Sequence, residues 1–90
     1  MEKNTLSAIL NAIIIANDGD MTKVIEINLA NGHIYRLTPE DIFFEDIYMR
    51  ARIFDTAMHY ADKQEIYIPY DAVMEIKNTK TKANDFKEKH

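Results

Sequence analysis

The chain has 90 residues, nearly half of them apolar, with a formal net charge of −4 and no cysteine. A chain of this size forms one domain, and the lack of cysteine excludes a disulfide scaffold and a thiol nucleophile. Residues 1–76 have a net charge of −7, so they do not attract nucleic acid over long range, whereas residues 77–90 hold five lysines. We predict a domain over residues 1–77 and a lysine-rich flexible tail over residues 78–90.

The first predicted element is a helix over residues 5–16, capped by Asn4 or Thr5 and ended by Gly19 in the left-handed conformation. Apolar residues recur at helical spacing on one face of it: Leu6, Ile9, Leu10, Ile13 and Ala16. This apolar stretch is too short to span a bilayer, and the small-residue cleavage site of a signal peptide is missing. We therefore predict a cytoplasmic protein that does not contact a membrane.

A β-hairpin is predicted around Asn31-Gly32. A two-residue turn there would pair Ala30 with His33 and would mix apolar and charged residues on both faces. A three-residue loop with Gly32 as the bulge residue pairs Leu29 with His33 instead, and we predict this register because it separates the two faces. Its apolar face holds Ile25, Ile27, Leu29, His33, Tyr35 and Leu37, and its polar face pairs Glu26 with Arg36.

Residues 38–63 allow two interpretations. Thr38-Pro39-Glu40-Asp41 has the pattern of a helix start, and one continuous helix from Pro39 to Asp62 would place some apolar residues at helical spacing. That helix would bring Asp46 and Arg50 onto its apolar side. In a strand, by contrast, the polar side chains over residues 47–54 separate cleanly from the apolar ones. We therefore predict a short helical turn near residues 39–42 and a strand near residues 47–54.

Two more strands are predicted, at Glu65–Ile68 and at Val73–Lys77, with a step at Pro69 because proline cannot donate to a sheet ladder. The predicted fold is α+β. An N-terminal helix precedes a β-rich region over residues 22–77, which forms a strongly bent antiparallel sheet or a small barrel of about five short strands. A bent open sheet leaves strand edges that need to be covered, so we predict a homo-oligomer.

The sequence lacks the residues that most catalytic sites need. The one serine, Ser7, lies in the predicted helix, and two glycines are too few for a phosphate-binding loop. Asp55, His59 and Asp62 would align on a helix face and could hold a divalent ion, but a hydrated surface is the better interpretation if residues 47–54 form a strand. We predict that the protein is not an enzyme and has neither a cofactor nor a metal site.

The candidate interaction surface consists of five residues: Tyr48, Arg50, Arg52, Tyr67 and Tyr70. The first three would share one strand face, where an aromatic ring and guanidinium groups could contact nucleic acid. Ion pairs with nearby acids are the favoured interpretation; those acids are Glu45, Asp46 and Asp55. Tyr67 and Tyr70 flank Pro69 and would present aromatic rings to a partner or pack against the core. A second charged group is an acidic cluster that could imitate nucleic acid: Glu40, Asp41, Glu45 and Asp46.

Two segments resemble known small β-barrel proteins. Residues 25–37, which include INLANGHIYRL, look like the first hairpin of Sm-like small barrels, and residues 65–77, EIYIPYDAVMEIK, resemble the end of YolD-like proteins. The resemblance implies a helix followed by five short bent strands, and rings or dimers formed through strand edges. It does not extend to RNA contacts, because Phe54-Asp55-Thr56 and Pro69-Tyr70-Asp71 depart from the family's RNA-binding residues.

The predicted function is that of a non-catalytic interaction or regulatory domain that acts through protein–protein contacts and self-associates. Two alternatives remain. One is a nucleic-acid-binding small barrel that uses Tyr48, Arg50, Arg52 and the basic tail. The other is an acidic inhibitor that imitates nucleic acid.

Overall fold

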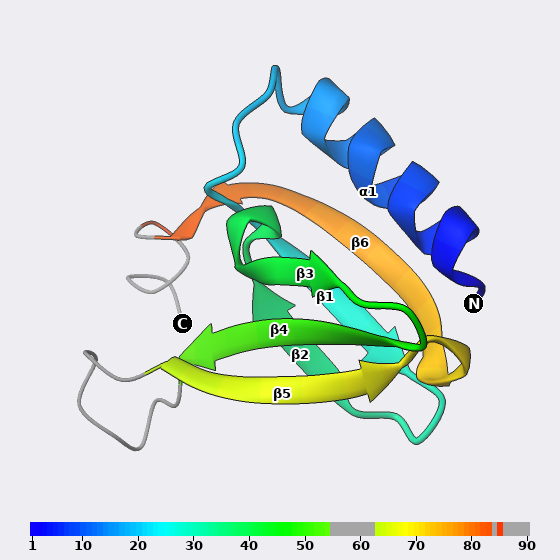
Figure 1. Cartoon of the computed structure of the whole chain (residues 1–90). Coiled ribbons are helices and arrows are strands. Elements are labelled where there is room, and N and C mark those ends of the chain that lie inside the picture. Colours follow the sequence, from blue (N-terminus) through cyan, green and yellow to red (C-terminus); the bar gives the residue numbers. More distant parts are fainter. Residues whose placement is uncertain (55–62, 84, 86–90) are drawn as a thin grey trace.

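The computed structural model describes residues 1–54, 63–83 and 85. Within these residues the elements are α1 (Lys3–Ala16), β1 (Lys23–Leu29), β2 (Ile34–Leu37), η1 (Pro39–Asp41), β3 (Ile42–Phe44), β4 (Tyr48–Phe54), β5 (Lys63–Pro69), η2 (Tyr70–Ala72) and β6 (Val73–Lys82). The strands form two antiparallel sheets of three, in the orders β2-β1-β6 and β3-β4-β5 (Figure 1). The α+β class is thus confirmed. The described strands do not close into a barrel, and they number six rather than five.

Helix α1 confirms the predicted N-terminal helix but starts earlier, at Lys3. The predicted cap is wrong, because the residue before the helix is Glu2 and no side chain caps the first turn. The amino group of Met1 donates to the backbone oxygens of Tyr70 and Val73, each at 3.0 Å. These two hydrogen bonds attach the start of the helix to η2 and β6.

The end of α1 is closed by backbone hydrogen bonds. The Asp18 amide donates to the Ile15 carbonyl at 3.0 Å and the Gly19 amide to the Ile14 carbonyl at 2.8 Å, which is the Schellman pattern. Gly19 has the predicted left-handed φ of 80°, and Asp18 shares it with a φ of 57°. Ala16, predicted on the buried face, is exposed.

The predicted three-residue hairpin register is confirmed. Glu26 lies opposite Arg36, their side chains form an ion pair of 2.8 Å, and Leu29 donates to the His33 carbonyl at 2.9 Å. Gly32 takes a φ of 86°, as a bulge residue requires. The two-residue alternative is excluded by this register.

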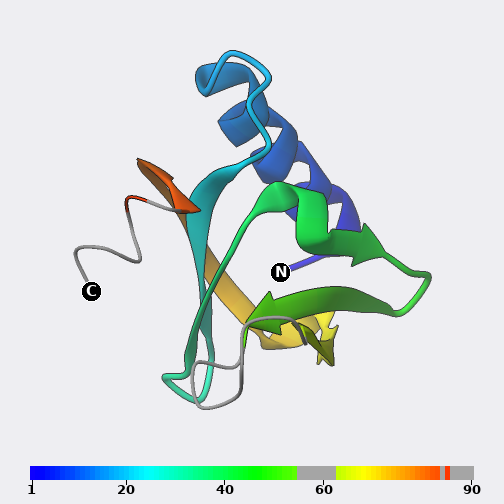
Figure 2. The same ribbon diagram turned by 90° about the vertical axis from the view of Figure 1, so that its left-hand side faces the viewer.

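The turn and strand predicted over residues 39–54 are also confirmed, as η1 and β4. A continuous helix from Pro39 is excluded over residues 39–54, and residues 55–62 lie outside the described part of the chain. Strand β3 was not predicted; η1 connects it to β2 (Figure 2). Through this short turn the chain passes from one sheet to the other.

The last two strands are longer than predicted. Strand β5 spans Lys63–Pro69, and its pairing with β4 ends at Pro69, where η2 begins. Strand β6 continues past Lys77 to Lys82, five residues into the segment predicted as a tail. The extension pairs with β1, where Lys82 lies opposite Lys23 and the Thr79 hydroxyl donates to the Val24 carbonyl at 2.6 Å.

The core lies between the inner faces of the two sheets and the apolar face of α1, which runs alongside β6 (Figure 1). Its residues come from every layer: Leu6, Leu10, Ile13, Ile25, Ile27, Leu37, Met49, Ala51, Ile68, Tyr70 and Val73. Asn17 at the end of α1 is 96% buried, and its amide exchanges two 3.1 Å hydrogen bonds with the amide of Asn78 on β6. No helix in the described residues is long and apolar enough to cross a membrane.

Candidate interaction surface

Three of the predicted surface residues share one face of β4, as the strand alternation requires. Tyr48, Arg50 and Arg52 point outward, whereas the intervening Met49 and Ala51 are 0% exposed and belong to the core. The neighbouring strands add residues to this surface. We call it the outer face, and it consists of Phe43, Tyr48, Arg50, Arg52, Glu65 and Tyr67.

Phe43 of β3 lies opposite Arg50, and the guanidinium groups of Arg50 and Arg52 both lie over its ring. The guanidinium carbon of Arg50 is 4.5 Å from the centroid of the Phe43 ring, and that of Arg52 is 5.1 Å from it. Both distances are within the range of cation–π attraction. Sequence reasoning does not identify Phe43, because its role depends on the register of a three-residue strand.

Carboxylates hold both guanidinium groups in place. Arg50 contacts Glu45 at 3.4 Å and Glu65 at 3.2 Å, and Arg52 contacts Asp41 at 3.3 Å. The predicted pairing with acids is confirmed for Glu45, while Asp55 lies outside the described residues. The Asp41 side chain is only 4% exposed and also accepts a 3.2 Å hydrogen bond from the Thr38 hydroxyl.

Tyr67 extends the outer face to β5. Its side chain is strongly exposed, its ring meets that of Tyr48 edge-on at 5.7 Å, and its hydroxyl donates to Glu65 at 2.6 Å. This hydroxyl, followed by Arg50, lowers the pKa of Glu65. The same hydrogen bond raises the pKa of Tyr67. Neutral tyrosine and ionised glutamate therefore stabilise each other between these two pKa values.

Replacing Tyr67 with phenylalanine is expected to raise the pKa of Glu65 toward its ordinary value, because the main group that favours the carboxylate is removed. A lowered pKa stabilises the fold at pH values above the unfolded-state value, and this contribution is lost as the pH falls through the folded-state pKa. The variant should therefore lose less stability on acidification. An NMR titration of the Glu65 carboxyl carbon measures the shift, and an unchanged pKa would contradict the assignment.

Tyr70 does not belong to the outer face, which corrects its predicted exposure. It is only 8% exposed, its hydroxyl donates to the Glu45 carbonyl at 2.5 Å, and its ring stacks on Phe44 with centroids 6.4 Å apart. Burial raises the pKa of this hydroxyl. The physical reason is the η2 turn after Pro69, which directs the ring inward toward the hairpin between β3 and β4.

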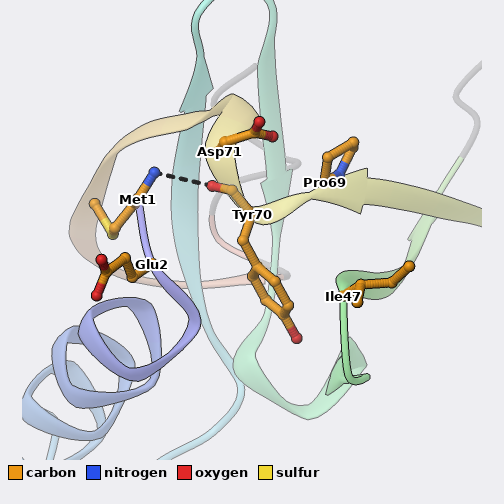
Figure 3. A pocket seen from close by; sticks show the side chains of 6 residues that line it. All are labelled: Met1, Glu2, Ile47, Pro69, Tyr70 and Asp71. Carbon is orange, nitrogen blue, oxygen red and sulfur yellow. Dashed lines mark hydrogen bonds between the residues drawn. The ribbon is translucent and has the colours of Figure 1, made fainter.

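An open hollow of about 630 Å³ lies beside Tyr70 (Figure 3). Its lining comes from the two residues before α1, the β3–β4 hairpin, the end of β5 and η2: Met1, Glu2, Ile47, Pro69, Tyr70 and Asp71. Ile47 is 77% exposed, so the hollow is walled partly by an apolar side chain at the surface. Glu2 and Asp71 add two carboxylates to this lining.

Asp55, His59 and Asp62, the disfavoured metal-binding alternative, lie outside the described residues. The described residues contain no group of three potential metal ligands. His33 is exposed at the end of its hairpin, where its ring contacts Tyr35 at 4.5 Å. The outer face is therefore the best-defined candidate site.

Comparison with known proteins gives no match: no protein-family model fits the chain, and no curated protein or solved structure is significantly similar to it.

Proposed function

We propose that this chain is a non-catalytic interaction domain that acts through protein–protein contacts and associates with itself. The observation that carries the proposal is the composition of the outer face. It combines the half-buried Tyr48 and the exposed Tyr67 with two arginines that are already held by carboxylates and by Phe43. Tyrosine and arginine are the residues enriched in the centres of protein interfaces.

Electrostatics favour a protein partner over nucleic acid. A nucleic-acid surface needs guanidinium groups that can pair with phosphates. Here Arg50 lies between Glu45 and Glu65, and Arg52 is held by the buried carboxylate of Asp41. A phosphate would have to displace these partners, whereas a protein surface can dock on the pre-ordered array of paired charges. Imitation of nucleic acid by the acidic cluster is likewise weakened, because Asp41 and Glu45 are engaged in these ion pairs.

The connection between the sheets supports the predicted resemblance to Sm-like small barrels. Strands β2 and β3 are separated only by Thr38 and η1, so the six strands amount to five elements if these two are counted as one bent strand. A helix followed by five short bent strands is the order that the resemblance implies. We therefore propose a small, incompletely closed barrel of Sm-like architecture.

Sedimentation equilibrium from micromolar to millimolar concentration tests the function. We expect the average mass to rise with concentration at physiological salt, and the Tyr67→Ala variant to associate more weakly than the unmodified protein. Asn28→Ala on the other sheet is the matched control and should associate normally. A strict monomer at every concentration contradicts the proposal.

Fluorescence anisotropy with labelled single-stranded RNA and DNA tests the competing function. Binding through the outer face would weaken steeply as the salt concentration rises and would be lost in the Arg50→Ala variant. We expect no such binding. Such binding would overturn the proposal in favour of a nucleic-acid-binding barrel.

A further inference from the structure

Each described sheet has two outer strands, which are β2 and β6 in one sheet and β3 and β5 in the other. Strands β2 and β3 span only four and three residues, so the two longer edges are those of β6 and β5. An unpaired edge offers a row of backbone donors and acceptors to another chain, and proteins commonly protect such edges. The two edges differ in this respect.

The β6 edge has several protecting features. Its pairing with β1 contains two register shifts, and Lys80 takes a left-handed φ of 60°. Side chains of the same strand bind its amides: Lys80 donates to the Asn78 side chain at 3.1 Å, and Thr81 donates to the Thr79 hydroxyl at 3.3 Å. Bulges and self-bonded amides make this edge a poor template for a second strand.

The β5 edge is regular. Its seven residues pair with β4 without any register shift, from Lys63 to Pro69. The Glu45 amide donates to the Tyr48 carbonyl at 3.0 Å, so the backbone polar groups of Tyr48 face β3. Because these groups alternate along a strand, those of Met49 and Ala51 face β5.

The partners of Met49 and Ala51 are Ile68 and Ile66, whose backbone groups therefore face β4. The backbone groups of Lys63, Glu65 and Tyr67 consequently face away from the sheet. Pro69 presents a carbonyl on this side but no amide. The outer edge of β5 is thus a short template with three amides, and it ends at proline.

The sequence of β5 is complementary to itself in one register. Antiparallel pairing of two copies about a two-fold axis at Ile66 sets each Glu65 opposite the Tyr67 of the other copy. These two side chains already form a 2.6 Å hydrogen bond within one chain. An axis at Glu65 would place two like charges opposite each other. An axis at Tyr67 would place Glu65 opposite the Pro69 of the other copy, which has no amide to donate.

Exposed apolar groups flank the same edge. Tyr67 on β5 is 60% exposed, and Ile47, in the hairpin next to the Pro69 end, is 77% exposed. Ile66 and Ile68 on the inner side would continue the apolar layer across the axis. The regular β5 edge, the register centred on Ile66 and the exposed apolar groups beside it therefore all fit a second copy of the chain.

We propose that this protein forms a two-fold dimer in which β5 pairs antiparallel with β5 of a second copy, centred on Ile66. The proposal rests on the self-association put forward above and specifies its geometry. The two β3-β4-β5 sheets join into one sheet of six strands, and their outer faces become continuous. The interface is closed, so it gives dimers rather than rings or fibres.

Cysteine cross-linking tests the register, since the natural chain contains no cysteine. In the proposed dimer the two copies of residue 66 form a non-hydrogen-bonded pair, whose Cα separation of about 4.5 Å suits a disulfide. Mild oxidation of the Ile66→Cys variant should give a covalent dimer as the main product. The matched control is Gln64→Cys, whose two copies would lie about 13 Å apart and should not cross-link. Equal cross-linking of both variants, or none in Ile66→Cys, overturns the arrangement.

Edge blocking gives an independent test. Tyr67→Pro removes an amide that faces away from β4, so the monomer should remain folded by circular dichroism. We expect its dimer dissociation constant, from sedimentation, to be at least tenfold higher than that of Tyr67→Ala, which removes the side chain but keeps the amide. Equal constants for the two variants overturn the β5 pairing.

The failures of the two proposals are distinguishable. A strict monomer contradicts the proposed function and the dimer together. Self-association without cross-linking in Ile66→Cys, or species larger than a dimer, leaves the proposed function standing and overturns only the β5 arrangement.

Discussion

Replacing Ile27 with alanine is expected to lower the free energy of unfolding by about 3 kcal/mol, the typical cost of truncating a buried isoleucine. Ile27 is 0% exposed and lies on β1 between Tyr35 of β2 and Ile76 of β6. It thus occupies the centre of the sheet, where neighbouring strands cannot move in to fill the cavity. For a domain of this size the loss corresponds to a fall in Tm of about 15 °C.

The matched control is Ile34→Ala on the adjacent strand. This isoleucine is 45% exposed, so its truncation leaves no enclosed cavity and should cost less than about 1 kcal/mol. Urea denaturation followed by circular dichroism measures both variants. Similar costs for the two would mean that the assignment of inner and outer faces to the β1–β2 hairpin is wrong.

The second large effect is expected at the Asn17–Asn78 pair. Asn78→Ala should cost about 2 kcal/mol, because it leaves the buried amide of Asn17 without its partner. The same side chain also accepts a hydrogen bond from the Lys80 amide, so its loss loosens the end of β6. Asn28→Ala is the control, since its amide bonds Glu75 at an exposed site and should contribute less than about 0.5 kcal/mol.

A double-mutant cycle separates the pair from its surroundings. If the two amides act on each other, the Asn17→Ala/Asn78→Ala protein should be about 1 kcal/mol more stable than the sum of the single losses implies. Denaturation of the four proteins under identical conditions gives this coupling energy. Strict additivity would show that each amide contributes through other contacts.

Local patterns determine the parts of this fold that the sequence predicts. The hairpin register follows from residues 25–37 alone, because only a bulge at Gly32 separates apolar from polar side chains. The strand β4 follows from the alternation around Arg50, and the same alternation places three of the five surface residues together. These predictions need no knowledge of distant contacts.

Two of the predictions that fail depend on partners far away in the sequence. Tyr70 is buried because its hydroxyl reaches the carbonyl of Glu45, and β6 extends beyond Lys77 where it pairs with β1 and where Asn78 meets Asn17. Short elements are equally difficult. Three residues of β3 carry too little periodicity to be read as a strand, so its contribution to the outer face is missed.

The pairing of β1 with β6 sets the order in which the chain can fold. Ile27 cannot meet Ile76 until almost the whole domain is available, so a polypeptide still being synthesised leaves the sheet β2-β1-β6 one strand short. Until then one side of β1, the most buried strand of that sheet, lacks its neighbour. Native assembly should therefore follow the emergence of β6 from the ribosome, and refolding in vitro should show the slower rates of domains dominated by non-local contacts.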